Sequence, residues 1–228
     1  MKLISKGKGN TDLISGYTSS SIGISEQVSL NVGVNAQVLT LNNSWALEPR
    51  AGIKWQFSPK SSFALAYGLH SRMEKMDVYF VKTQGTGDRS VNKDLGFTKA
   101  HHVMLSYGFK ISDNANMKIE PYFQQLYNVP VIADSSYSVL NRRDFYVENV
   151  LVNQGKGRNI GVDITLERYL YKGLYYMVTA SIFDSKYYGG DRKWRNTLYN
   201  RNFIVNVLGG KEWMVGRDKQ NIFSMTFK

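Results

Sequence analysis

The stretch VSLNVGVNAQV, residues 28–38, alternates strictly between apolar and polar side chains. Valine, leucine and alanine occupy every second position, and serine, asparagine, glycine and glutamine lie between them. Because successive side chains of a β-strand point to opposite faces, this period of two predicts a strand with one apolar and one polar face. Soluble strands average roughly five to six residues, whereas roughly nine to eleven are needed to cross a bilayer at a tilt. The length of this stretch favours a membrane strand.

Alternation of the same kind recurs along the chain. It predicts further strands over residues 47–57, 63–70, 102–110, 159–167 and 174–182, weaker strands over 117–127, 199–207 and 222–227, and a poorly patterned strand before residue 26. Turn-forming residues separate these strands, so we expect them to pair in order as an antiparallel up-and-down meander. The fold class is therefore all-β, with about nine or ten strands that form part of a transmembrane β-barrel.

The two faces of these strands differ in polarity, as they do in outer-membrane barrels, which are apolar outside and polar inside. We expect one face to contact lipid; it carries Leu47, Ile53, Trp55, Leu65, Val103, Leu105, Ile160, Val162 and Ile164. We expect the other face to line an aqueous lumen; it carries Glu48, Arg50, Lys54, Asn159, Asp163 and Glu167.

The connections between strands are sorted by length. Tight turns at residues 58–61, 112–116, 171–173 and 216–220 alternate with three long connections, at 72–97, 128–157 and 184–197, and a short one at 42–44. Alternate connections of an up-and-down sheet lie at the same end, so most long loops lie at one end, as in bacterial outer-membrane barrels. Aromatic residues near the tight turns suggest an interfacial girdle, although aromatics also favour strands generally. They are Trp55, Phe57, Phe63, Tyr107, Phe109, Tyr169, Tyr171, Trp213 and Phe223.

The chain is basic and contains no cysteine. Its 29 Lys and Arg against 18 Asp and Glu give a formal net charge of +11, which favours anionic partners such as lipid or lipopolysaccharide phosphates. The positive charge is spread without a single basic stripe, so no nucleic-acid partner is predicted. The absence of cysteine excludes disulfides and thiolate chemistry. No run of about 18 apolar residues is present, which excludes a helical membrane protein.

The sequence contains no evident catalytic constellation. Of the three histidines, His101 and His102 are adjacent and would face opposite ways on a strand, while His70 falls on the lumen face. A metal site needs several convergent ligands, and none is predicted. Asp163 and Glu167 share a face but lie four residues apart, too far for a carboxylate pair. We therefore predict no enzyme activity, no cofactor and no metal.

Several short motifs resemble a known family. They are SWALEPR at residues 44–50, AYGLHS at 66–71, NQGKGRNIGVD at 153–163 and WRN at 194–196. In this order and spacing, the chain resembles the C-terminal barrel region of TonB-dependent outer-membrane receptors from Bacteroidetes, of the kind that carries a carboxypeptidase-regulatory-like N-terminal domain. The resemblance extends over most of the chain, roughly residues 28–213.

The resemblance implies a location in the bacterial outer membrane and a barrel of about 22 strands with a plugged lumen. It implies a plug domain, the TonB complex, and outer-membrane lipid and lipopolysaccharide as partners, with uptake of a nutrient that the sequence does not identify. Residues 1–228 contain no recognisable plug or signal segment. We therefore expect the chain to be a partial outer-membrane β-barrel domain, a fragment of such a receptor.

Two other functions remain open from the residues. A small complete outer-membrane barrel, acting as an adhesin or structural protein, would need about eight or ten strands. A soluble basic β-barrel that binds a ligand would bury one face of each strand in a closed core and would not sort its loops to one end.

The resemblance implies that ligands bind at the outer end, through the loops and the upper lumen. Aromatic and arginine side chains are the types that most often anchor recognition, although they could instead pack loop against loop. The candidates in the long connections are Tyr79, Phe80, Arg142, Arg143, Tyr188, Trp194 and Arg195, and those lower in the lumen are Arg50, Tyr122 and Gln124.

Overall fold

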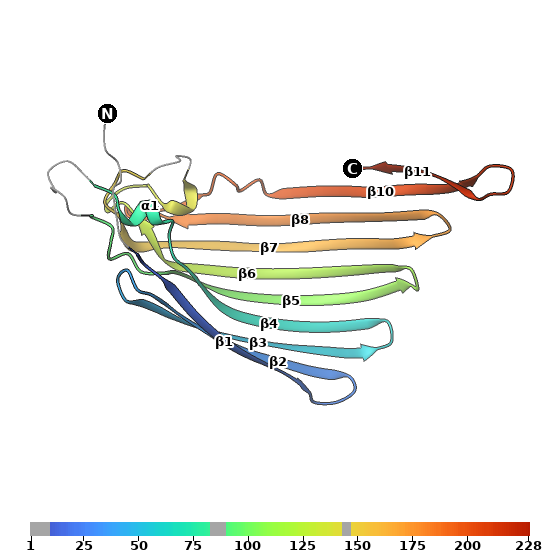
Figure 1. Ribbon diagram of the computed structural model, residues 1–228, viewed down its shortest axis with the longest axis horizontal. Coiled ribbons are helices and arrows are strands. Elements are labelled where there is room, and N and C mark those ends of the chain that lie inside the picture. Colours follow the sequence, from blue (N-terminus) through green and yellow to red (C-terminus); the bar gives the residue numbers. More distant parts are fainter. Residues whose placement is uncertain (1–9, 83–89, 143–146) are drawn as a thin grey trace.

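The computed structural model describes residues 10–82, 90–142 and 147–228. They form one sheet of 11 strands in which sequence neighbours pair antiparallel (Figure 1). The strands are β1 (Leu13–Gly23), β2 (Val28–Leu39), β3 (Ser44–Ser58), β4 (Ser61–Arg72), β5 (Thr98–Ser112), β6 (Ala115–Val131), β7 (Val152–Tyr171), β8 (Leu174–Tyr188), β9 (Trp194–Asn196), β10 (Phe203–Val215) and β11 (Asn221–Phe227). Ten follow one another across the sheet, and the short β9 pairs only with β8. The predicted all-β meander is confirmed.

The helical content is very small. One turn of α-helix, α1 (Met76–Tyr79), and one 3-10 turn, Val139–Asn141, lie in the connections. Among the residues that the structure describes, no helix has the length and apolar character needed to span a membrane.

Several strands extend further toward the loop end than predicted. β7 has 20 residues, although alternation predicted a strand only over 159–167. Its first third, rich in glycine and polar residues, lacks alternation but still pairs with β6 and β8. The strands pair there through backbone hydrogen bonds, which do not require alternating side chains. The long connections predicted at 128–157 and 184–197 are correspondingly shorter. The strand predicted at 199–207 begins later, at Phe203, and continues through the two glycines to Val215.

Most short turns lie at one end of the sheet, and the longer loops lie at the other end together with the short β2–β3 turn (Figure 1). The β7–β8 turn shows why the turns are tight. Lys172 and Gly173 both have positive φ, 53° and 73°, as a two-residue hairpin turn of type I′ requires. A Cβ at Gly173 would also collide with the carbonyl oxygen of Glu212 on β10. Glycine is therefore required here both for its backbone conformation and for space.

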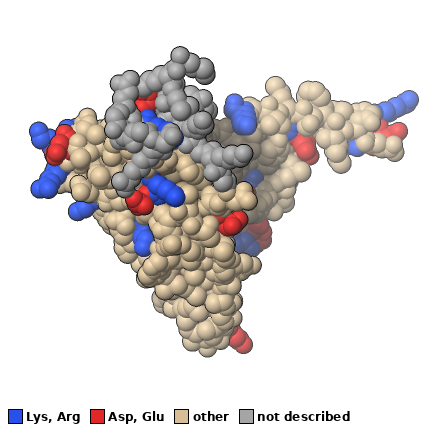
Figure 2. Space-filling view, turned by 60° about the vertical axis from the view of Figure 1, so that its left-hand side comes forward, with Lys and Arg blue, Asp and Glu red and all other residues tan. Residues whose placement is uncertain are grey.

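The register places the apolar side chains of successive strands on one face. Tyr67, Val103, Phe123 and Ile160 are consecutive ladder partners from β4 to β7, and each is exposed. The residues predicted to face lipid lie on this outward face, with Trp55 50% and Ile160 49% exposed. Figure 2, with the loop end turned forward, shows charged side chains gathered near the loops and a wall below them that is almost free of charge.

The buried hydrophobic cluster of the described residues lies at the loop end, not within the wall. We call it the loop core; it comprises Leu39, Ala46, Val78, Tyr79, Val81, Leu95, Phe97, Val147 and Leu151. The ends of β2 and β3 meet the first and second long connections there. Loop closure over the wall is thus stabilised by burial of apolar side chains from segments far apart in sequence.

Candidate functional site

The inner face of the sheet lines an open cavity of about 1030 Å³, to which both polar and apolar residues contribute. One row of ladder partners crosses it from β3 to β8, and we call it the lumen row. It comprises Arg50, Gly68, His102, Gln124, Asn159 and Ser185. All six line the cavity. The predicted lumen residues Arg50, Tyr122 and Gln124 are therefore brought together, and Asn159 and Asp163 join them.

Hydrogen bonds hold the β6–β8 part of the lumen row in place. Asn159 Nδ2 donates to Gln124 Oε1 at 3.0 Å, and Ser185 Oγ donates to Asn159 Oδ1 at 2.7 Å. Thr197, which follows β9, donates through Oγ1 to Ser185 Oγ at 3.0 Å. Because its oxygen accepts from Asn159, the Gln124 amide presents its NH₂ group as a donor. The third long connection is thereby tied to the lumen wall.

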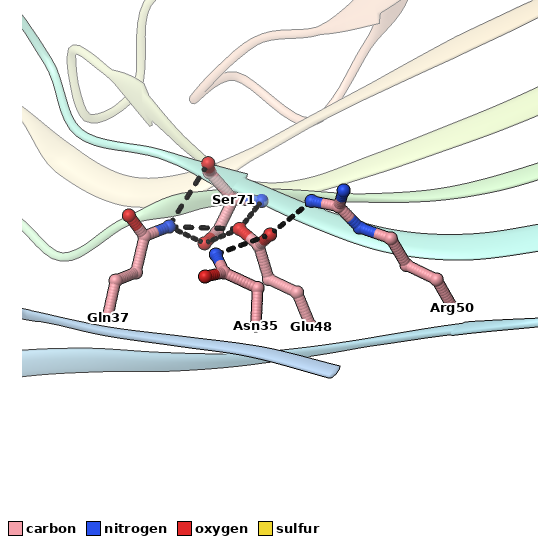
Figure 3. Close-up of polar contacts among 5 residues, drawn as sticks. All are labelled: Asn35, Gln37, Glu48, Arg50 and Ser71. Carbon is pink, nitrogen blue, oxygen red and sulfur yellow. Dashed lines mark hydrogen bonds and ion pairs between the residues drawn. The ribbon is translucent and has the colours of Figure 1, made fainter. Parts of the chain in front are cut away.

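Glu48 forms the most heavily bonded group of the lumen wall (Figure 3). Its side chain is only 4% exposed, and its carboxylate accepts from both the backbone N–H and the hydroxyl of Ser71, at 2.7 and 2.6 Å. Gln37 Nε2 and Asn35 Nδ2 donate to it at 2.9 and 3.1 Å. A buried carboxylate must be bonded in this way to offset its desolvation. The network thus connects β2, β3 and β4 near the loop end of the sheet.

The same carboxylate positions Arg50. Arg50 Nη2 donates to Glu48 Oε2 at 2.8 Å, while the Arg50 side chain remains 51% exposed. A guanidinium has five N–H donors in a fixed planar arrangement. One of them is used by Glu48, which leaves the rest of the group available to a ligand in the cavity. Glu48 is therefore a positioning residue and Arg50 the side chain that it presents.

Two histidines meet in the cavity. The rings of His70 and His102 lie 4.6 Å apart between centroids. His70 reaches this position by lying over Gly68, the ladder partner of His102, since a Cβ at position 68 would come within 2.6 Å of His70 Nε2. His101 faces the opposite way from His102, as predicted, and its Nδ1 lies 2.9 Å from the Tyr67 hydroxyl. Groups of three or more His, Cys, Asp or Glu arranged to hold a metal are not found among the described residues.

The candidates in the first long connection belong to the loop core. Tyr79 is fully buried, and its hydroxyl accepts from the backbone N–H of Glu74 at 3.2 Å. Phe80 packs against the same cluster. Neither lines the cavity, so both occupy the loop-packing position considered above. Burial raises the pKa of the Glu74 carboxyl, because loss of water outweighs the nearby Arg72 charge. Burial likewise raises the pKa of Tyr79.

The described candidates in the second and third connections do not line the cavity. Arg142 directly follows the 3-10 turn, and Arg143 lies outside the described residues. Arg195 is bonded to Asp191, with Nη1 donating to Oδ1 at 2.9 Å, and this guanidinium holds the pKa of the Asp191 carboxyl below its usual range. Tyr188 and Trp194 are ladder partners with rings 5.4 Å apart. By strand alternation from Ser185 they lie on the outward face.

The sequence did not identify Glu48 as a positioning residue, or His70 and His102 as a pair. Alternation placed His70 and Glu48 on the lumen face, and that was the available signal. Their contacts depend on the register between β3, β4 and β5, which alternation does not specify.

Comparison with known proteins supports the fold. No family model and no curated protein matches the sequence. Solved structures do match. The siderophore receptor PiuA from Acinetobacter baumannii is similar at 14% sequence identity with a TM-score of 0.65, and the match covers 88% of this chain and 31% of PiuA. The ferric-catecholate import receptor Fiu from Escherichia coli matches at 11% identity and 0.66, over 91% and 32%. The FrpB iron transporter from Neisseria meningitidis matches at 13% and 0.61, over 91% and 31%.

These similarities establish an architecture. The described strands have the fold of one part of the barrel wall in outer-membrane receptors and transporters. The chain spans about a third of the length of the proteins that it matches, 31% for PiuA. The neighbours are transporters and receptors, not enzymes.

Proposed function

We propose that this chain is part of the barrel wall of a bacterial outer-membrane receptor that imports a nutrient. The observation that carries the proposal is an 11-stranded meander with an apolar outward face, a cavity on the inner face that carries the polar lumen row, and its long loops at one end. Residues 1–228 are a partial barrel domain that further strands complete. A plug domain fills the lumen, and the TonB complex supplies energy for transport. A source in Bacteroidetes and a carboxypeptidase-regulatory-like domain remain predictions from the motifs.

Two structural features count against the alternatives. In the described sheet β1 pairs only with β2 and β11 only with β10, so the 11 strands do not close as a small complete barrel would. A soluble barrel would bury its apolar strand face, yet Ile182 is 62% and Phe203 68% exposed on that face. The similarity to part of much larger receptors supports the hypothesis that this chain is part of a receptor barrel.

The lumen row is the proposed ligand site. Arg50, His102 and the Gln124 amide offer hydrogen-bond donors to the cavity, and Tyr122 adds a hydroxyl. Donors of this kind suit an anionic, oxygen-rich ligand, and a metal chelate is such a ligand. PiuA and Fiu are a siderophore receptor and a ferric-catecholate receptor, which supports this ligand class. Arg195, which by strand alternation faces the opposite side from the outward Trp194, would contact the ligand at the rim.

The test is uptake of radiolabelled iron, supplied as a ferric catecholate, by cells whose receptor carries this chain. Arg50→Gln removes the positioned charge and is expected to lower uptake about tenfold or more, since a charged hydrogen bond contributes roughly 1.5–3 kcal/mol. Lys54→Gln is the matched control, because it removes a positive charge from the same face of β3 outside the cavity. Equal uptake by the two variants, at equal outer-membrane levels, would remove Arg50 from the site.

A further inference from the structure

The outward face of β7 and β8 changes from apolar to basic near the loop end. On β7, Ile160 is followed toward the loops by Arg158 and then Lys156, each two residues further along the same face. On β8, Lys186 is the direct ladder partner of Arg158. We call Lys156, Arg158 and Lys186 the outer basic patch. Like charges directly opposite in a sheet are destabilising, so this arrangement costs free energy unless an anion offsets it.

Within the described part of the chain, the ion pair found at the patch offsets only part of that charge. Asp184 Oδ2 lies 3.1 Å from Lys186 Nζ, but the same carboxyl also accepts from Asn200 through Oδ1 at 2.9 Å. One carboxylate can balance one of three positive charges. Among the described residues, the buried Nε of Arg158 has no hydrogen-bond partner.

Aromatic rings hold the cations of the patch in place. The Arg158 guanidinium lies 5.5 Å from the centre of the Trp194 ring, and Lys156 Nζ lies 5.7 Å from that of Tyr188. The two rings are themselves in contact, 5.4 Å apart. Cation–π contacts orient a charge without neutralising it. The patch is therefore a fixed cluster of cations beside an amphipathic aromatic pair.

The position of the patch relative to the apolar band of the membrane can be estimated from distances along β7. A second arginine, Arg168, lies on the same face ten residues further on, near the tight turns. At about 3.3 Å per residue this is about 33 Å along the strand, and a strand tilt of about 40° reduces it to about 25 Å, the height of the apolar band of outer-membrane barrels. The outward side chains between the two arginines are Ile160, Val162, Ile164 and Leu166. Arg158 and Arg168 thus lie at the two headgroup levels.

The two levels are not equivalent. Arg168 also stacks on a ring, that of Tyr171 at 5.7 Å, and its buried Nε also has no partner among the described residues. Its ladder partner on β8, however, is the uncharged Tyr176. Opposed cations therefore occur at the loop end, which faces the outer leaflet in outer-membrane barrels.

We propose that the outer basic patch binds a phosphate group of the phosphorylated glycolipid in the outer leaflet, with the acyl chains lying against Ile160, Val162 and Ile182. The inference rests on the proposed outer-membrane function and adds a lipid site outside the lumen. Arg158 supplies the planar donors that match phosphate oxygens, and the two lysines supply point charges. The apolar band directly below the patch commits the site to a lipid-anchored phosphate rather than a soluble anion.

The test uses the protein purified from outer membranes in detergent, with binding of bisphosphorylated lipid A measured by native mass spectrometry. The double variant R158Q and K186Q is expected to bind lipid A at least tenfold more weakly. R168Q is the matched control, since it removes a ring-stacked arginine from the same face of the same strand at the other level, and it should bind as the wild type does. Dephosphorylated lipid A should bind wild type as weakly as lipid A binds the double variant.

The remaining outcomes separate the competing explanations. Unchanged binding by the double variant would overturn the proposal, and so would inorganic phosphate that displaces lipid A at equal concentration. If the double variant fails to reach the outer membrane, K156Q provides the same test, because it removes one charge of the patch and keeps the Arg158–Lys186 pair. Fractionation of the same cells tests the proposed function separately: a protein absent from the outer membrane would refute that function, whereas a correctly located protein without phosphate-dependent binding would refute only the lipid site.

Discussion

The wall and the loop core treat apolar side chains in opposite ways. On the wall, Trp55 and Ile160 are 50% and 49% exposed, and their strands bury no continuous apolar layer. In the loop core, Val78, Tyr79 and Val81 are fully buried. The same types of residue are thus outside in one region and inside in the other. Under the proposed function, the difference means that the two regions are built for different solvents, hydrocarbon around the wall and water around the loops.

The junction between the two regions is made of polar contacts. Glu48 and its donors lie where the wall meets the loops, and Thr197 links the third connection to the lumen row. Below this level the strands alternate regularly, and above it alternation is lost. The predictions that follow perturb the loop core, the wall and their junction in turn.

Removal of the largest buried side chain of the loop core should have the largest effect. Tyr79→Ala is expected to destabilise the loop layer by about 3–5 kcal/mol, the range for large aromatic truncations in cores, because a fully buried ring is replaced by a cavity. Hydrogen exchange of the loop amides, compared with that of the wall, measures the effect. Tyr199→Ala is the control, since Tyr199 is 65% exposed in another connection. Equal protection in both variants would mean that the cluster does not hold the loops.

A charge on the outward face should have the next largest effect. Val162→Arg places a cation near the middle of the apolar band and is expected to cost about 2–4 kcal/mol in refolding into lipid bilayers. Thr165→Arg, on the lumen face of the same strand, should cost much less, because its side chain remains in water. Equal tolerance of the two changes would show that the faces are assigned the wrong way round.

The same contrast explains what the sequence could predict. Most of the wall is predictable because its clearest strands repeat a period of two, and their lipid and lumen faces follow directly from that period. The loop core is not, because Leu39 and Ala46 meet Leu95 and Leu151 from distant segments that share no period. From the sequence alone, Tyr79 was therefore compatible both with a ligand contact and with packing between loops. The His70–His102 contact was equally hidden, since it requires both the β4–β5 register and the space above Gly68.

A smaller effect is expected at the junction. Glu48→Gln retains the shape of the side chain but removes the charge that accepts from Ser71, Gln37 and Arg50, and should cost about 1–3 kcal/mol, the range for an unsatisfied buried group. The melting temperature in detergent measures this loss. Glu120→Gln is the comparison, because Glu120 forms an ion pair with Lys118 and its side chain is more exposed. A larger loss at Glu120 than at Glu48 would contradict the role given to the network.

The smallest effect should be a pH dependence of the loop layer, through Glu74. This residue is 7% exposed, and Thr98 Oγ1 donates to its carboxylate at 3.3 Å. Burial raises its pKa, so the native loop keeps the proton to a higher pH than the unfolded loop, whose glutamate titrates at about 4.3. The free energy of unfolding falls as pH rises wherever the native state binds more protons than the unfolded state. The loop layer should therefore lose stability as pH rises from the unfolded value through the raised native pKa, and remain constant above it.

Glu74→Gln tests this sign directly. Glutamine keeps an acceptor for Thr98 and carries no charge, so the variant should match the wild type at acidic pH, where Glu74 is protonated in both states. Above the native pKa the variant should be the more stable, since it avoids the buried charge. Limited proteolysis of the loops from acidic to neutral pH measures the difference, and Asp94→Asn, at an exposed position of the same connection, is the control. A variant less stable than the wild type at neutral pH would mean that Arg72 outweighs desolvation and that Glu74 holds the loop core together as an ion.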